Sequence, residues 1–376
     1  MASYIIRRLL LVIPTLIGMT LVIFLVMALS PGGISAALIS REGNMKPDER
    51  KATEKYLNKR YGLDKPLPVQ YLRWLNKVSP LGFRTVTDED PRAQGDHPAV
   101  NAGDVDSWWP IFKKPDLGDS IIRRRPVWDL LMEALPITLL LNVVSIPIVY
   151  ICAIITGIQA ASRRGGSFDI TTGTLFLALW SIPVTLPAVL GIGFLTSAQY
   201  PHLKWFPTNG LHDLLSADMS FLPTFGSGGF HRGFLLDAIW HMVLPVICMS
   251  YGGFAMLSKL ARGSVLENVA ADYARTARAK GLSSRDVLYR HVFHNSLLPL
   301  ITVAAHIIPG LLVGSVIVET IFGISGMGRL FIEAVQQKDF ELVLTEAVIS
   351  GLLGLGSYLA ADILYAVADP RVKYDN

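Results

Sequence analysis

The chain has 376 residues, of which 51% are hydrophobic and only 17% are charged, and its formal net charge is +4. Soluble domains carry about a quarter charged residues, so this composition excludes a chain built only from ordinary soluble domains. In a membrane protein a small basic excess reflects topology, so no nucleic-acid partner is expected.

The first predicted element is an apolar run at residues 9–29, which holds no charged residue. A helix of this length, at about 1.5 Å per residue, spans a hydrocarbon core of roughly 30 Å. The run is longer than the apolar part of a signal peptide, and Pro31 would directly follow the cleavage point, so we expect an uncleaved span. Similar stretches predict five further spans, at 133–160, 170–196, 236–257, 298–321 and 342–367. The predicted fold class is an all-α membrane protein with six transmembrane helices.

A long segment, residues 31–131, follows the first span. Its patterns predict a polar helix, a short amphipathic helix and an irregular loop, at 48–63, 68–78 and 84–110. The basic cluster at 123–126 fits either solvated charge near lipid head groups or part of a docking surface for an outside partner. We divide the chain into a terminus with the first span, this segment and a five-helix core: 1–30, 31–131 and 132–376.

Lys and Arg are distributed unevenly between the spans, which predicts the orientation of the chain. Thirteen lie in the N-terminus, the 161–169 loop, residues 258–297 and the C-terminus, against four in the other short loops. The seventeen in the long segment do not count, because long loops translocate regardless of charge. We therefore expect both termini and the 258–297 loop in the cytoplasm, and the 31–131 and 197–235 segments outside.

The two cysteines, Cys152 and Cys248, lie in different predicted spans. A disulfide or half of a metal site is one interpretation. We favour two small buried apolar residues, and no metal site is predicted.

Residues 272–295 form a basic segment between two apolar stretches, with five Lys or Arg opposed by only two Asp. Apolar residues at three-to-four spacing predict a helix over 265–280, which Gly281 would end. Ser283, with Asp286 three places on, predicts the N-cap of a second helix that continues to the end of the segment. Topology alone explains the charge but not this divided element, so we favour a docking element for a cytoplasmic partner.

The basic segment resembles the coupling loop of permease subunits of ABC importers of the dipeptide, oligopeptide and nickel type, through RTARAKG at 275–281. Four other stretches of this chain are also similar to that family: YIIRRLLLVIPTLIGMTLVIFLVMALSPGG, WHMVLP, ETIFGISGMGRL and DILYAVADPRVKY. The resemblance therefore covers almost the whole chain. It implies that coupling to an ATPase falls to Asp272, Tyr273, Arg275, Thr276, Ala277, Arg278, Ala279, Lys280, Gly281 and Leu282.

The resemblance implies an assembly in the lipid bilayer of the bacterial cytoplasmic (inner) membrane. Its other members would be a second homologous permease subunit, two cytoplasmic ATPase subunits that bind ATP and Mg, and an external solute-binding protein. No Lys follows a Gly in this chain, so it lacks a P-loop, and we expect it to hold no cofactor and to be no enzyme. The implied function is half of a translocation pathway for di- and oligopeptides. A nickel chelate, glutathione or an oligosaccharide stays open as the solute.

Two features depart from the broader ABC-importer pattern. Its Glu-Ala-Ala is replaced by Arg275, Thr276 and Ala277, and its later Pro by His294, as in the peptide-type branch. The outward segment is also longer than usual, chiefly around 84–112, and the role of this extension is open.

Polar residues inside the predicted spans are candidates for a weakly polar translocation path: Asn142, Ser145, Thr185, His241, His306 and Ser315. Hydrogen bonding between helices, or relief of helix backbone beside prolines, is the alternative that we weight more heavily. An ionisable residue near the outer end of the fifth span points to function, so a gate or hinge is predicted at Glu319, Gly323, Gly326 and Gly328. An interfacial salt bridge between Glu319 and Arg329 is the alternative.

Three other classes fit the sequence less well. An intramembrane enzyme would need a motif such as HExxH or GxSxG, and the chain has neither. A stand-alone ion-coupled transporter would favour charged residues at mid-membrane, of which the span interiors are nearly free. A structural anchor would not need so many Pro and Gly residues inside its spans.

Overall fold

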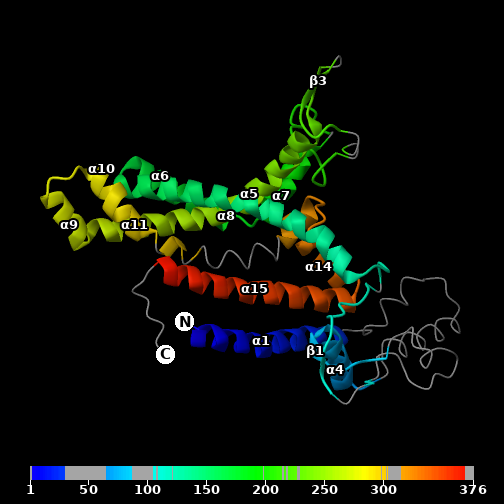
Figure 1. Cartoon of the computed structure of the whole chain (residues 1–376). Coiled ribbons are helices and arrows are strands. Elements are labelled where there is room, and N and C mark those ends of the chain that lie inside the picture. Colours follow the sequence, from blue (N-terminus) through cyan, green and yellow to red (C-terminus); the bar gives the residue numbers. More distant parts are fainter. Residues whose placement is uncertain are drawn as a thin grey trace. The chain divides into compact units, whose positions relative to one another are not determined.

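The computed structural model is mainly helical (Figure 1). It describes residues 2–29, 65–86, 105–106, 109–120, 122–197, 199–213, 216, 219–226, 229–297, 299–301, 303 and 315–368. Its longer helices are α1 (Ala2–Ala28), α4 (Leu67–Val78), α5 (Val127–Ser162), α6 (Ser167–Ser181), α8 (Gly233–Ala270), α9 (Asp272–Ala279), α14 (Met327–Gln336) and α15 (Phe340–Ala368). Its shorter helical pieces are α7 (Thr185–Leu190), η2 (Gly191–Thr196), α10 (Ser284–Asp286), η4 (Val287–Val292), α11 (Phe293–Ser296) and α13 (Val316–Ile321). Two antiparallel pairs of short strands join β1 (Leu81–Gly82) to β2 (Ile111–Phe112) and β3 (Thr224–Gly226) to β4 (Gly229–His231).

Four described helices are long and apolar enough to cross a membrane, in the stretches Leu10–Ala28, Val127–Ser162, Gly233–Ala270 and Phe340–Tyr358. A bent pair, Ser167–Ser181 with Thr185–Thr196, makes a fifth if it is one span. These stretches coincide with five of the six predicted spans. The remaining predicted span, 298–321, lies largely outside the described residues, as does the predicted helix 48–63.

The bend in the third predicted span reaches 82° and has a local cause. Ile182, which follows α6, takes an extended conformation with φ −87° and ψ 119°. The next residue is Pro183, and the ring of a proline disfavours helical geometry in the residue before it. The expected continuous helix over 170–196 is therefore wrong: the chain forms two helical pieces with a break between them.

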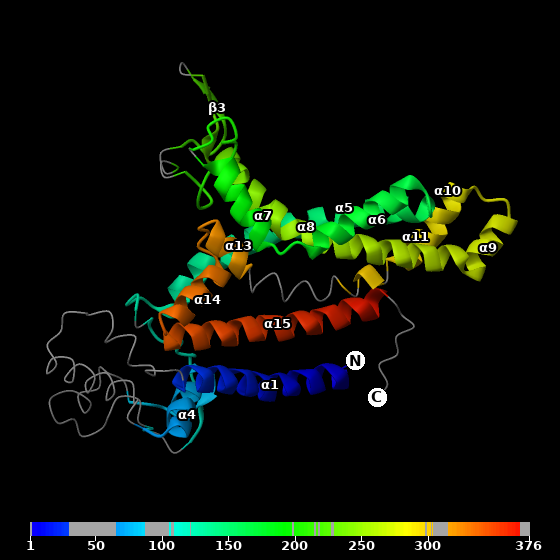
Figure 2. The ribbon, with the colours of Figure 1, turned by 180° about the vertical axis from the view of Figure 1, so that it is seen from behind.

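The described chain falls into two compact units. The first comprises residues 1–133 and 331–352, and α4 packs against α1 within it (Figure 2). Tyr71 donates a hydrogen bond from its hydroxyl to the Ile17 carbonyl at 2.9 Å. Its apolar cluster consists of Phe24, Tyr71, Trp74, Val78, Phe340 and Leu344. This arrangement confirms the amphipathic helix predicted at 68–78.

Polar contacts tie the predicted outward segment to the junction of α14 and α15 within the same unit. Arg123 forms an ion pair with Glu333 at 2.6 Å, and Lys77 forms one with Glu341 at 3.2 Å. The Ser120 hydroxyl bonds to the Asp339 carboxylate. At least one residue of the basic cluster at 123–126, Arg123, therefore pairs with an acidic residue of the same chain.

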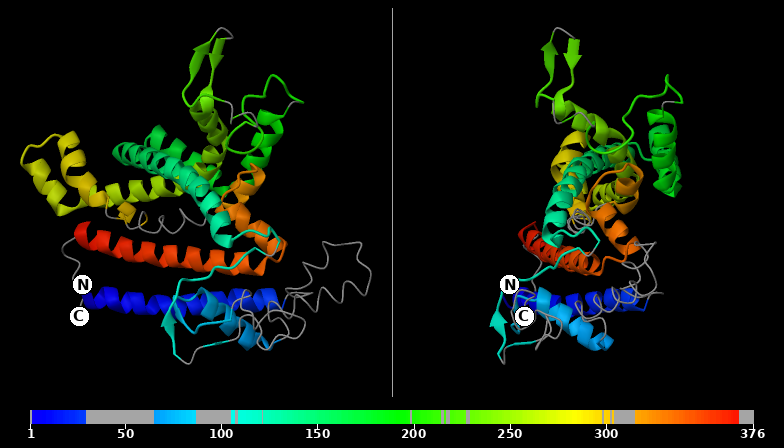
Figure 3. Two further views of the ribbon diagram at one scale, coloured as in Figure 1. Left: turned by 45° about the vertical axis from the view of Figure 1, so that its right-hand side comes forward. Right: turned by 90° about the vertical axis from the view of Figure 1, so that its right-hand side faces the viewer.

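The second unit comprises residues 134–330 and 353–376 and contains the rest of α5, together with α6, α7, α8 and α9. α6 lies along α8, and the β3–β4 hairpin projects beyond the start of α8 (Figure 3). Close approach of α5 to α8 depends on small residues: a Cβ at Gly157 would lie 2.6 Å from the Ala261 side chain. Both cysteines are free thiols; Cys248 is buried as expected, whereas Cys152 is exposed on α5, so its expected burial is wrong.

Candidate functional site

The basic segment predicted to dock a partner lies at the end of the longest described helix. α8 continues to Ala270, and Ala271 then takes an extended conformation (φ −69°, ψ 152°) before α9 begins. The predicted single helix over 265–280 is therefore wrong: its first part is the end of α8 and its second part is α9. We refer to α9, α10, η4 and α11 together as the coupling element.

Two arginines of α9 bind back to the end of α8. Arg278 donates to the Val269 carbonyl at 3.3 Å, and Arg275 donates to the Ala270 carbonyl at 3.1 Å. Basic side chains near a helix C-terminus satisfy its last carbonyls and complement its dipole. The extended residue after α8 is thus stabilised by side chains to which the sequence had assigned only topology and docking.

The turn after α9 has the geometry that the sequence predicts. Gly281 has a φ of 83°, which is accessible to glycine at little cost. The Ser283 hydroxyl accepts a hydrogen bond from the Asp286 backbone N–H at 3.1 Å, as an N-cap does. The second helix is confirmed in outline, but its middle is the π-helical η4, which no local pattern indicated.

The inner face of the coupling element is apolar. Ala274 and Ala277 of α9 are buried in a cluster with Val287 and Val292 of η4, and the cluster continues onto α5 through Ile158. The outer face is exposed and carries nine of the ten residues predicted to couple to an ATPase, all except Ala277. The element therefore has one face fixed to α5 and α8 and one face available to a partner.

Exposed apolar and aromatic side chains lie among the charged residues of the outer face. Tyr273 and Leu282 are each 38% exposed, and Tyr289 is 51% exposed. The Arg275 side chain is 70% exposed although its guanidinium reaches the end of α8. Exposed aromatic and apolar residues ringed by charge are typical of protein–protein contact surfaces.

A second site is a cavity of about 390 Å³ at the break between α6 and α7. It is lined by Asn142, Trp180, Ile182, Val184, Cys248, Met249, Tyr251, Gly252 and Ser315. Asn142 and Ser315 are among the residues predicted for a translocation path. No charged side chain lines the cavity in the described part of the chain.

The backbone freed by the helix break is satisfied from α8. The Tyr251 hydroxyl donates to the Ile182 carbonyl at 2.5 Å. Non-helical backbone at membrane depth is tolerated where it is buried in protein or lines a cavity, and this break lies at a cavity wall. Tyr251 was not predicted, because a lone tyrosine in an apolar helix carries no local signal.

The other predicted path residues that the structure describes, Ser145, Thr185 and His241, do not line the cavity. The Ser145 hydroxyl bonds to the Asn142 carbonyl at 3.4 Å, and His241 Nδ1 lies 2.9 Å from the Asp237 carbonyl. Thr185 opens α7 and is exposed, and His306 lies outside the described residues. The contacts of Ser145 and His241 each lie within a single helix, and His241 Nδ1 also lies 3.5 Å from the Asp237 carboxylate. Among the described residues, no group of three or more His, Cys, Asp or Glu could hold a metal ion.

Glu319, predicted as a gate residue, is fully buried in α13. Its Oε1 accepts from the Thr138 hydroxyl and its Oε2 from the Arg329 backbone N–H, both at 3.0 Å. The Thr138 hydroxyl in turn accepts from the Met327 N–H at 2.8 Å. These acceptors serve N–H groups in the first turn of α14, which have no partner within their own helix.

The glycines predicted with Glu319 are packed rather than free. A Cβ at Gly326 would lie 2.5 Å from Thr138 Oγ1, and one at Gly328 would lie 2.8 Å from the Val316 backbone nitrogen. Gly323 has a φ of 64° and turns the chain after α13. Side chains are thus excluded from a tight corner between α13 and α14.

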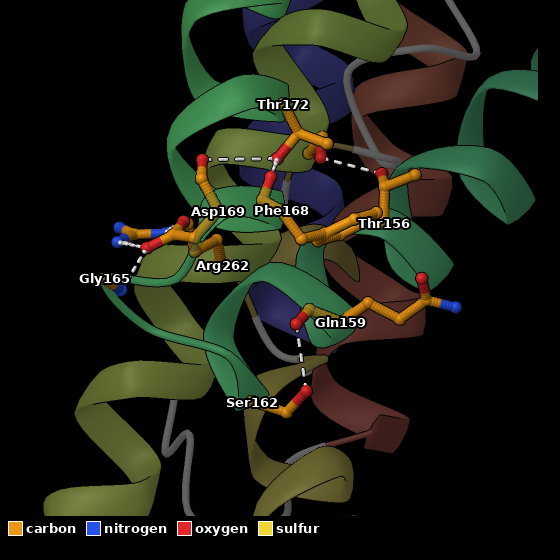
Figure 4. Close-up of polar contacts among 9 residues, drawn as sticks. Thr156, Gln159, Ser162, Gly165, Phe168, Asp169, Thr172 and Arg262 are labelled. Atoms are coloured by element: carbon orange, nitrogen blue, oxygen red, sulfur yellow. Dashed lines mark hydrogen bonds and ion pairs between the residues drawn. The ribbon is translucent and has the colours of Figure 1, made fainter.

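An ion pair that the sequence did not reveal joins α6 to α8 (Figure 4). Arg262 donates to both carboxylate oxygens of Asp169, with Nε–Oδ1 at 2.5 Å and a terminal nitrogen to Oδ2 at 2.7 Å. Asp169 Oδ2 also accepts from the Gly165 N–H at 2.9 Å, and the Asp169 side chain is only 7% exposed. The two residues are separated by 93 positions, so only the packing of α6 on α8 brings them together.

Residues 153–374 match the family model for the binding-protein-dependent transport system inner membrane component. The chain is 34% identical to the oligopeptide transport system permease protein AppB of Bacillus subtilis (strain 168), over 100% of both chains. It is 31% identical to the di/tripeptide transport system permease protein DppB of Pseudomonas aeruginosa (strain UCBPP-PA14), over 100% of this chain and 99% of that one. It is 29% identical to the peptidoglycan transport system permease protein YejB of Agrobacterium fabrum (strain C58 / ATCC 33970), with the same coverage.

Proposed function

We propose, for a chain that belongs to the family of inner membrane components of binding-protein-dependent transport systems, that it forms half of a peptide path and couples this path to ATP hydrolysis by separate subunits. The chain is a permease subunit of an ABC importer and not an enzyme. Relatives named for oligopeptides and for di/tripeptides support peptides as the solute.

The observation that carries the coupling role is the position of α9 at the end of α8. The inner face of α9 is buried against α5 and η4, and its arginines bind the last carbonyls of α8. A partner that pushes on the exposed face therefore pushes on α8 itself. We propose that Leu282 and Tyr273 are apolar anchors for an ATPase subunit and that Asp272, Arg275, Thr276, Arg278, Ala279, Lys280 and Gly281 complete the contact, whereas the buried Ala277 supports it from the inner face.

The cavity at the helix break is the proposed part of the solute path. Its lining is weakly polar, with Asn142, Tyr251 and Ser315 among apolar residues. A path without fixed charge suits peptides, because peptides of different sequence present different side-chain charges to one wall. The packed corner around Glu319 and Gly323 is proposed to move as one piece when the path opens.

The proposed setting is a bacterial inner membrane with both termini in the cytoplasm. The proposed assembly contains a second homologous permease, two ATPase subunits that bind ATP and Mg, and an external solute-binding protein that meets the 31–131 segment. In this arrangement the 258–297 loop faces the ATPases, and the predicted spans of the core, residues 132–376, cross the bilayer.

Peptide uptake by proteoliposomes that contain the complete complex tests this proposal. Leu282→Asp places a charge on the exposed anchor of the coupling element, and Leu282→Met, which keeps an apolar side chain of similar volume, is the matched control. We expect Leu282→Asp to assemble with the second permease but to lose ATP-dependent uptake and binding-protein-stimulated ATP hydrolysis, and Leu282→Met to retain both.

Normal uptake by Leu282→Asp would contradict the coupling role. The solute is tested separately, with labelled di- and oligopeptides beside a nickel chelate, glutathione and an oligosaccharide. Uptake of one of the last three without any peptide uptake would overturn the peptide assignment and leave the coupling proposal standing.

A further inference from the structure

We propose that α6 and α8 form a lever with two anchors, in which Asp169 and Arg262 at one end and Tyr251 at the other are positioning residues that carry the movement of α9 to the cavity wall. This inference rests on the proposed function. It concerns contacts within the second unit only, where α6, α8, α9 and the cavity all lie.

The first anchor is the Asp169–Arg262 pair, close to the coupling element. Arg262 lies two turns, or about 12 Å, before the end of α8 at Ala270. A guanidinium that donates to both oxygens of one carboxylate fixes orientation as well as distance. The third bond, from the Gly165 N–H, holds the turn before α6 to the same carboxylate (Figure 4). The start of α6 is thereby fixed to the final turns of α8.

The second anchor is the hydrogen bond from Tyr251 to the Ile182 carbonyl at the helix break. On α8 the two anchors are about 16 Å apart, and on α6 about 20 Å apart, at about 1.5 Å per residue. Between them Phe176 of α6 packs edge-on against Phe254 of α8, with ring centroids 4.6 Å apart. α6 is therefore held to α8 at both ends and in the middle.

The lever connects the coupling element to the cavity without an intervening loop. α8 is one helix from the cavity residue Tyr251 to its end beside α9. α6 ends at Ser181, directly after the cavity residue Trp180 and directly before the break at Ile182, which also lines the cavity. A rotation or a slide of α6 against α8 would break one of the two anchors. Any displacement of α9 therefore moves the α6 wall and the α8 wall of the cavity together.

The test measures the number of peptides imported per ATP hydrolysed by the complete complex in proteoliposomes. Asp169→Asn keeps the shape of the side chain and removes its charge, and Tyr251→Phe removes only the hydroxyl. We expect Asp169→Asn to lower peptides per ATP by about tenfold, the effect of losing charge-assisted hydrogen bonds, and Tyr251→Phe by about threefold, the effect of losing one neutral hydrogen bond, with stimulated ATP hydrolysis near wild type. Exchanging the charges, with Asp169→Arg and Arg262→Asp together, is expected to recover part of the ratio.

A purely structural role gives a different result. It would lower the amount of assembled complex, and uptake and ATP hydrolysis would fall in equal proportion, so that the ratio stays at the wild-type value. That outcome overturns the lever. If Leu282→Asp also leaves coupling intact, the proposed function fails as well; if only the anchor variants couple normally, the lever alone fails.

Cross-linking tests whether the first anchor stays closed during transport. Asp169→Cys and Arg262→Cys would be joined by a short thiol-cleavable bifunctional reagent, with Cys152 and Cys248 replaced by Ala. We expect the bridged complex to import nearly as many peptides per ATP hydrolysed as wild type. The unbridged double variant is expected to import far fewer peptides per ATP. Loss of uptake on bridging, with recovery after reduction, would show that the pair opens during the cycle and would overturn the proposal.

Discussion

Replacing Glu319 with Gln tests whether the buried carboxylate holds the corner between α13 and α14. One side-chain oxygen of the variant can still accept from the Thr138 hydroxyl, but its amide NH₂ then faces the Arg329 backbone N–H. A buried N–H without an acceptor costs about 1–3 kcal/mol. The missing negative charge at the first turn of α14 costs about 0.3–2 kcal/mol more. We therefore expect the variant to lose roughly 2–4 kcal/mol of stability.

The assay is the thermal unfolding midpoint of the purified complex in detergent, followed by loss of its monodisperse chromatographic peak. Glu333→Gln is the matched control, because Glu333 lies on α14, the helix whose first turn Glu319 binds, but pairs with Arg123 where both side chains are about a third exposed, 33% and 29%. Partly exposed pairs of this kind contribute about 0–1 kcal/mol. If Glu319→Gln unfolds at the same temperature as Glu333→Gln, the carboxylate does not hold the corner and the reasoning is refuted.

Three further predictions concern the turn after α9, the cavity and the loop that precedes α8. Ser283→Ala removes the acceptor for the Asp286 N–H and is expected to cost about 1 kcal/mol, seen as faster hydrogen exchange across the turn; Ser283→Thr, which keeps the hydroxyl, should exchange like wild type. Asn142→Leu makes the cavity wall apolar and is expected to lower peptide uptake with ATP hydrolysis unchanged; unchanged uptake would remove Asn142 from the path. Burial lowers the pKa of His212 from its ordinary 6.5, so the folded loop favours the neutral ring. The stability that the folded loop gains from holding a neutral His212 ring is fully present above the pKa of the unfolded chain. It is lost as the pH falls through the pKa of the folded chain. After correction for intrinsic rates, exchange around His212 is therefore expected to accelerate as the pH falls below the ordinary pKa of 6.5. The acceleration should be absent in His212→Phe, which keeps a ring on Phe234.

The membrane helices could be predicted where the signal is a simple sum of the hydrophobicity of successive residues. Length and apolarity alone place α1, α5, α8 and α15, because each residue contributes independently to the cost of leaving the bilayer. The break after α6 was not predictable from the same signal. Pro183 lies in an apolar run, and proline in a membrane helix is compatible with a kink or with a complete break. The carbonyl that the complete break frees at Ile182 accepts a hydrogen bond from Tyr251 of another helix, a partner that no local pattern indicates.

The coupling element shows the same division between local and distant causes. Gly281 and Ser283 were predicted correctly because a positive φ and an N-cap are decided by residues within one turn. The Asp169–Arg262 pair and the Glu319–Thr138 bond were missed because their partners are 93 and 181 positions apart. Taken alone, Arg262 counted only toward the predicted orientation of the chain, and Glu319 marked only an ionisable residue near the end of a span.

The departure from Glu-Ala-Ala at the coupling element has a physical explanation in these contacts. In this chain α8 ends at Ala270, and its last carbonyls carry the negative end of the helix dipole. The first position of the pattern, Arg275, donates to one of those carbonyls, where a glutamate would be repelled and could not donate. The third position keeps the alanine of the pattern: Ala277 is buried against η4 and α5, where a larger side chain would displace the element. Ala277 therefore meets a packing requirement. Arg275 is explained by the end of α8 at Ala270, which only Ala271 separates from the start of α9.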